Sequence, residues 1–176
     1  QLKDDEHITQ INALNKDIIP DQYKGHQIFT ICTRSGKFFI FQKKENSLTK
    51  VLNLEKASPL VHLVKSKTKN HLFIVSLPPS EEEESETTCL NVQPCSFDVR
   101  GRPLLQESFK VLIDFKVESF APNPFLPCEI ICFNKKKLIT KNIDTPEGYT
   151  LTSDNFENSE IDGDILNISF LRSGLM

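Results

Sequence analysis

The sequence contains no tryptophan, only two tyrosines and only six glycines in its 176 residues. It also lacks a phosphate-binding loop, a dinucleotide-binding glycine motif, the Gly-x-Ser-x-Gly turn of serine hydrolases and the His-Glu-x-x-His pair of zinc proteases. The four histidines show no ligand spacing. These absences predict a protein that is not an enzyme and that has no catalytic residues, no cofactor and no small-molecule ligand.

Strong charge and long apolar runs are missing too. The formal net charge of −3 gives no indication that nucleic acid is the main partner. No apolar run approaches the roughly 20 residues of a membrane helix, and no signal-peptide pattern is present. We therefore expect an intracellular protein, nuclear or cytoplasmic, without a membrane partner. Because the chain starts at Gln1 and stops just after a strand-like segment, we expect it to be part of a longer protein.

The five cysteines are expected to form neither a disulfide framework nor a metal site. Their odd count and the lack of a secretory signal favour free thiols. Cys32, Cys95 and Cys132 lie in or beside apolar runs, where a free cysteine acts as a small buried hydrophobe. The spacing of Cys128 and Cys132 resembles half of a metal site, but no second pair or nearby histidine completes it.

Short runs rich in Phe, Val and Ile, separated by turn residues, predict an all-β chain. The clearest unit is a hairpin of two strands, 27–33 and 37–42, around the turn Arg34–Gly36. Helical signals are few; the best helix candidate is around Asp4–Lys16, although the repeat described below starts its first strand near Ile8. Further strands are expected at 48–54, 59–64, 71–77, 95–99, 108–113, 115–120, 128–133, 137–143, 149–152 and 165–171.

These strands recur with a period of about 50 residues, which is typical of the four-stranded blades of a β-propeller. We expect residues 1–176 to form one domain of antiparallel blades, a partial or irregular propeller. An antiparallel β-sandwich or open barrel is the alternative fold. The expected blades are 8–54, 59–113 and 115–152, with the start of a fourth at 165–171.

The sequence resembles the WD40-like propeller family in one region. Gly25-His26 is similar to the Gly-His pair of that family, and Thr33–Gly36 followed by Lys37–Phe41 is similar to its b–c turn and c strand. Phe41 stands where the family commonly has tryptophan, and Ser35 stands where it has a structural aspartate. The resemblance implies a divergent propeller, and propellers of this kind are mainly platforms for protein assembly.

An acidic segment follows two prolines near the middle of the chain. We expect a flexible loop over 78–94, because its carboxylates repel one another and it holds too few apolar groups to fold. The segment is either a solubilising insert or a docking strip for a basic partner. Ser80 precedes acidic residues and is a candidate phosphorylation site, where phosphate would add about −1.5 to −2 charges. The candidate docking residues are Glu81, Glu82, Glu83, Glu84 and Glu86.

Lysines gather at two predicted turns. Such lysines commonly protect sheet edges from unwanted pairing, and nucleic-acid contact is the alternative role. In a propeller the two turns would lie on opposite faces of the ring and would form no common patch. The candidate basic contacts are Lys65, Lys67, Lys69, Lys135, Lys136 and Lys137.

Taken together, these features predict a non-catalytic protein–protein interaction scaffold in a multisubunit complex, with other protein subunits as partners. A nucleic-acid-binding module using the lysine-rich turns is the first alternative. A substrate-recognition domain attached to a larger enzyme is the second.

Overall fold

The computed structural model describes residues 7–13, 25–45, 47–55, 58, 60–67, 71–78, 86–98, 100, 102–144, 165 and 168. All of the regular structure in these residues is antiparallel β, which confirms the predicted all-β class. The described sheets are open, and an antiparallel sandwich fits them as well as a propeller does. The strands are β1 (Ile8–Ala13), β2 (Gln27–Thr33), β3 (Lys37–Lys44), β4 (Ser47–Glu55), β5 (Val61–Lys65), β6 (His71–Ser76), β7 (Thr88–Phe97), β8 (Pro103–Leu105), β9 (Phe109–Ile113), β10 (Ser119–Pro122), β11 (Glu129–Phe133) and β12 (Leu138–Asn142).

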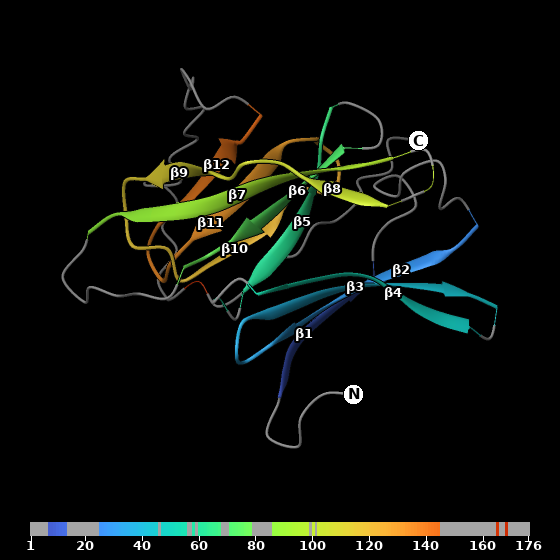
Figure 1. The fold of residues 1–176 in the computed structure, drawn as a ribbon. Helices are drawn as coiled ribbons and strands as arrows, with labels where there is room; N and C mark the ends of the chain where they lie inside the picture. The colour runs from blue at the N-terminus through green and yellow to red at the C-terminus, as the bar shows by residue number, and fades with distance from the viewer. Residues whose placement is uncertain are drawn as a thin grey trace, which may run out of the picture.

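The first sheet has the order β1-β2-β3-β4, so each strand pairs with its neighbours in the sequence (Figure 1). The predicted hairpin is confirmed as β2 and β3, with Gly36 at φ 82° in the turn. Glycine suits this position because a left-handed backbone costs it little. The Gly36 N–H donates to the Thr33 carbonyl over 2.9 Å and closes the turn.

The second sheet has the order β5-β6-β7-β8, and β9 also pairs with β7. Cys95 pairs with Leu105, whereas Val92 pairs with Phe109, so three steps along β7 match four along the opposite chain. β8 and β9 therefore act as one strand interrupted by a β-bulge. Pro94 lies at the bulge, where its missing N–H breaks no regular ladder and its carbonyl still accepts from the Gln106 N–H over 3.0 Å.

The third sheet has the order β10-β11-β12. Its strands are short, and half-buried residues alternate with buried ones from Glu129 to Cys132 of β11. The Asn134 side chain shapes the β11–β12 turn by accepting from the N–H groups of Lys136 and Lys137 over 2.9 and 2.7 Å.

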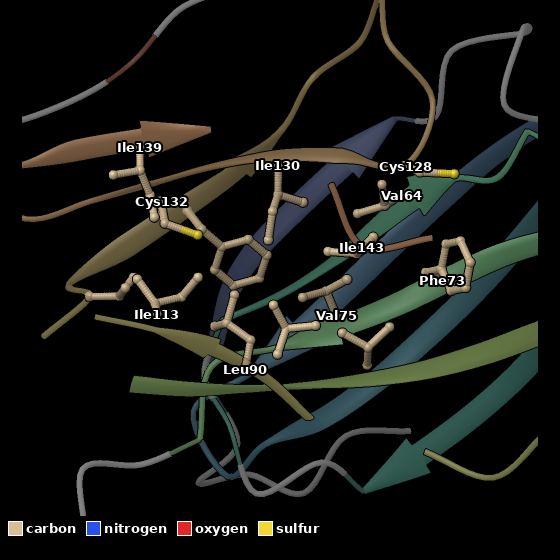
Figure 2. Close-up of a cluster of buried hydrophobic side chains, with 14 of the residues drawn as sticks. Val64, Phe73, Val75, Leu90, Ile113, Cys128, Ile130, Cys132, Ile139 and Ile143 are labelled. Atoms are coloured by element: carbon tan, nitrogen blue, oxygen red, sulfur yellow. The ribbon is translucent and has the colours of Figure 1, made fainter. Parts of the chain in front are cut away.

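Two apolar clusters hold the sheets together, one on each face of the second sheet. Leu72 and Ile74 of β6 pack toward Ile28 and Phe38 of the first sheet. Phe73 and Val75, which alternate with them along β6, belong to the other cluster, which includes side chains of the third sheet. Figure 2 shows this second cluster, with Ile130, Cys132 and Ile139 facing Val75, Leu90 and Ile113. The three sheets are therefore stacked in chain order.

This stacking explains the composition of β6. A strand covered on both faces needs apolar residues at every position, whereas a half-exposed strand alternates. Residues 72–76 of β6 are all buried. Burial of large side chains on both faces places most of the hydrophobic stabilisation around the second sheet.

Two expectations were wrong where the structure describes the chain. Ile8–Ala13 is a strand, as the repeat predicts, and not part of the candidate helix, because pairing with β2 outweighs the local preference. The loop expected over 78–94 ends earlier, since residues 88–94 belong to β7 and pair with both β6 and β9. The strand expected at 149–152 lies outside the described residues, as does nearly all of the one expected at 165–171.

Candidate interaction surfaces

The outer face of the first sheet, which points away from the second sheet, is apolar. Ile11, Ile31 and Phe39 form one row across β1, β2 and β3. Phe29 and Phe41 form the next row. The outer-face residues alternate with the buried inner-face residues along β2 and β3. Because these outer-face residues are also Phe and Ile, both faces of the sheet are apolar. Such composition is typical of a strand covered on both sides.

This face is hollowed toward one end. The hollow has a volume of about 340 Å³ and is walled by Ile11, Phe29, Ile31, Phe41 and Leu48. Lys43 brings a positive charge to the hollow. Ile11 is 61% exposed and Leu48 is 62% exposed, so the wall is accessible from solvent. Contiguous exposed apolar surface of this kind is typical of a protein-binding site.

A second exposed apolar site lies on the loop between β10 and β11. Phe125 is 51% exposed and Leu126 is 52% exposed. The Oδ1 of Asn123 accepts from the N–H groups of both residues, over 2.9 Å and 3.3 Å. The loop therefore has a defined shape although its two large side chains contact solvent.

A half-buried polar contact connects all three sheets. The amide Nε2 of Gln10 in β1 donates to the Nε2 of His62 in β5 over 3.2 Å. The His62 ring meets the ring of Phe120 in β10 edge to face, with 5.0 Å between centroids. Burial lowers the pKa of His62 to about 4, so the ring is neutral near pH 7. His62 is therefore a structural contact among the first strands of the three sheets.

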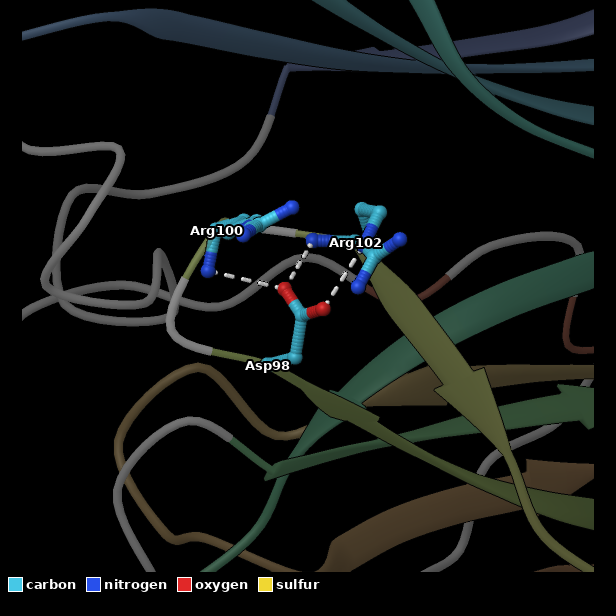
Figure 3. Close-up of polar contacts among 3 residues, drawn as sticks. All are labelled: Asp98, Arg100 and Arg102. Atoms are coloured by element: carbon cyan, nitrogen blue, oxygen red, sulfur yellow. Dashed lines mark hydrogen bonds and ion pairs between the residues drawn. The ribbon is translucent and has the colours of Figure 1, made fainter.

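One exposed turn is held by several hydrogen bonds to the carboxylate of Asp98. Asp98 accepts from the N–H groups of Arg100 and Arg102, over 2.9 and 2.8 Å, and pairs with the Arg102 guanidinium over 2.7 Å (Figure 3). The backbone hydrogen bond from Arg102 contributes most to holding the pKa of Asp98 below its ordinary value. These bonds fix the connection between β7 and β8.

Of the residues of the predicted acidic docking strip, the structure describes one. Glu86 is exposed and stands just before β7. Ser80 and the glutamates Glu81, Glu82, Glu83 and Glu84 lie outside the described residues. The docking and phosphorylation predictions for this segment stay predictions.

The lysine candidates fall into two separate groups. Lys67 lies after β5 and pairs with Asp144 over 3.2 Å, while the carbonyl of Lys65 accepts from the Cys128 N–H over 2.6 Å. These contacts place the first group near the end of β12. The second group is exposed in the β11–β12 turn, at the start of β12, and consists of Lys135, Lys136 and Lys137. The length of β12 separates the groups by roughly 20 Å, and Lys69 lies outside the described residues.

Four of the cysteines are buried, as expected for Cys32, Cys95 and Cys132, and Cys89 is exposed. Burial raises the pKa of the Cys32, Cys95 and Cys128 thiols to about 11 and that of Cys132 to about 12. Among the described residues, no group of three or more His, Cys, Asp or Glu side chains could hold a metal ion. The described part of the chain also contains no helix long and apolar enough to span a membrane.

The two exposed apolar sites were missed in the sequence, although each has a signal there. Lys37–Gln42 contains four consecutive apolar residues, so β3 is apolar on both faces. Phe125 and Leu126 stand between Pro124 and Pro127, which keep them out of a regular strand.

The fold and these surfaces define an all-β protein of stacked antiparallel sheets with exposed apolar sites on its first and third sheets. No family model, no curated protein and no solved structure matches the chain.

Proposed function

We propose that this protein is a non-catalytic scaffold that binds other protein subunits within an intracellular, nuclear or cytoplasmic complex. The apolar outer face of the first sheet is the observation that carries the proposal. Ile11 and Leu48 remain exposed there beside a 340 Å³ hollow, although both would be more stable if covered. A second protein chain is the surface that would cover them.

We further propose that the three sheets are blades of a divergent, WD40-like β-propeller. Three features support it. The sheets follow one another along the chain, each is antiparallel, and the strands pair in sequence order apart from β9, which pairs with β7. The first strands β1, β5 and β10 also lie near one another, through the contacts of His62 with Gln10 and Phe120. Blades stacked around an axis would bring their first strands together in this way.

The experiment is an affinity purification of the tagged protein from cell extract, carried out in parallel with and without nuclease treatment. The test variant is the pair Ile11→Thr and Leu48→Thr, which places β-branched threonine, a side chain that suits strands, at both positions and removes apolar surface from the hollow. The matched control is Leu112→Thr in β9, where the leucine is 58% exposed but lies away from the hollow. We expect stoichiometric protein partners with the natural sequence and the control, and their loss with the test variant.

Two outcomes would contradict this function. Recovery of nucleic acid alone, abolished by the nuclease, would favour the lysine turns as the binding site. Partners that persist unchanged with the Ile11 and Leu48 substitutions would exclude the outer face of the first sheet.

A further inference from the structure

The loop between β10 and β11 is fixed at its tip and at its base. At the tip, Asn123 accepts from the N–H groups of Phe125 and Leu126. At the base, the N–H and the side-chain amide of Asn123 donate to the carbonyl and the carboxylate of Glu129, over 2.9 and 2.7 Å. Prolines at positions 122, 124 and 127 restrict the backbone further.

Cys128 anchors the far end of the loop. It is buried and adopts a left-handed backbone, with φ 63°, which a non-glycine residue rarely takes. Its N–H donates to the Lys65 carbonyl over 2.6 Å, and its carbonyl accepts from the Ile143 N–H over 2.7 Å. Two neighbouring segments thus maintain an unfavourable conformation at this residue. The consequence is a pre-ordered projection, the Phe125–Leu126 loop, which would lose little conformational entropy on binding.

The hollow on the first sheet matches this projection in size and chemistry. Its volume of about 340 Å³ is near the lower end of the roughly 300–1,000 Å³ of ligand pockets, and this suits one or two side chains rather than a whole sheet. Its wall is apolar, as are Phe125 and Leu126. Lys43 contributes a positive charge at the hollow, and Glu129 contributes a carboxylate at the base of the loop.

The loop and the hollow of one molecule are on opposite sides of the stack. The third sheet covers one face of the second sheet, and the first sheet covers the other. The hollow is on the outer face of the first sheet, beyond both clusters. A loop that fills it must therefore come from a different molecule.

We propose that the Phe125–Leu126 loop of one copy inserts into the hollow of a second copy. The proposal rests on the proposed function, because it names one occupant of the same apolar face. The contact joins two different surfaces, so each bound copy still offers one free loop or hollow, and association continues into chains or closed rings. The contact area is small, and we expect weak association with a dissociation constant on the order of 100 µM.

The experiment is sedimentation velocity of the purified protein from about 1 µM to about 500 µM, a range that brackets this affinity. The loop variant carries Phe125→Ser and Leu126→Ser. The hollow variant carries Ile11→Thr and Leu48→Thr. The control variant carries Leu104→Thr and Leu112→Thr, two exposed leucines of the second sheet. Circular dichroism of each variant verifies that the sheets have formed.

We expect the natural sequence and the control to gain mass with concentration, and the loop and hollow variants to stay monomeric when alone. Mixed together, the two variants should form a heterodimer and nothing larger, because the mixture contains one intact loop and one intact hollow per pair. A natural sequence that is monomeric throughout would overturn the inference, and so would a mixture that stays monomeric. If the protein is monomeric but the partners purified from cell extract are still lost with Ile11→Thr and Leu48→Thr, the scaffold function holds and self-association is excluded.

Discussion

His62 and Phe120 meet edge to face across the second and third sheets, with their ring centroids 5.0 Å apart. The histidine is also bonded to Gln10 of the first sheet, over 3.2 Å. No charge contributes to lowering its pKa among the residues that the structure describes, and burial alone accounts for the shift. Protonation of His62 would therefore place an uncompensated charge where all three sheets meet.

The first prediction follows from this pKa. The unfolded chain binds a proton at His62 near pH 6.5, whereas the folded chain binds it only near pH 4. The stabilisation from a neutral His62 is therefore complete above pH 6.5 and is lost as the pH falls to 4. The total loss of stability across this pH interval is about 3 kcal/mol. Urea unfolding measures the free energy of unfolding of the natural protein and of His62→Leu from pH 4 to pH 8. The difference between the two free energies should change by about this amount over that range.

The control for this measurement is His7→Leu, since His7 is exposed just before β1. If the free energy of unfolding, taken relative to the natural protein, changed equally with pH for both variants, His62 would be accessible to water in the folded protein.

The second prediction compares two phenylalanines. Phe38 is fully buried between the first and second sheets, and Phe125 projects into solvent. Phe38→Ala should lower the free energy of unfolding by about 3–5 kcal/mol, because it removes buried surface and leaves a cavity. Phe125→Ala should change it by less than about 0.5 kcal/mol. Urea unfolding measures both, and a large loss with Phe125→Ala would show that this side chain stabilises the fold rather than a contact between molecules.

The β strands themselves were largely predictable from the sequence. The run around Arg34–Gly36 has strong strand formers on both sides of a glycine turn, and local chemistry alone selects a hairpin there. Pairing between segments far apart in the chain was harder to predict. The segment around Ile8 is both the best helix candidate and the expected first strand of the repeat, because its strand character depends on β2, whose residues begin 14 positions after Ala13. Thr88–Pro94 was assigned to a loop because its polar residues alternate with Leu90 and Val92, which become buried only when the third sheet covers them.

The candidate surfaces were less predictable than the fold. Charged residues were predicted as contacts because their charge is visible in the sequence itself. The apolar candidates depend on which face of a strand stays uncovered, and that is decided by how the sheets stack. Ile31 and Cys32 are adjacent and both apolar, yet Cys32 is buried against the second sheet and Ile31 lines the hollow.

The third prediction concerns the turn at Asp98. Asp98→Ala removes the acceptor of the Arg100 and Arg102 N–H groups, so hydrogen exchange at both amides should accelerate. Asp98→Asn keeps an acceptor oxygen but loses the ion pair with Arg102, and its exchange rates should be intermediate. The pKa of Asp98 lies below 3.8, so its contribution is present above that pH and is lost as the pH falls through the folded value. Asp114→Ala, at an exposed bend, is the control, and equal protection in all variants would contradict the role of Asp98.

The last prediction concerns thiol reactivity. Cys89 is exposed at the start of β7, while the other four thiols are buried and have pKa values of about 11 or 12. Because only the thiolate attacks a disulfide reagent, the buried thiols should react far more slowly near pH 8. A colorimetric titration of the folded protein should therefore detect one fast thiol, and the same titration in denaturant should detect all five. Cys89→Ser should remove the fast reaction, whereas Cys32→Ser should leave it unchanged. More than one fast thiol in the natural protein would mean that the contact between the sheets opens on the timescale of the titration, since the thiols of Cys32 and Cys95 lie between the first and second sheets.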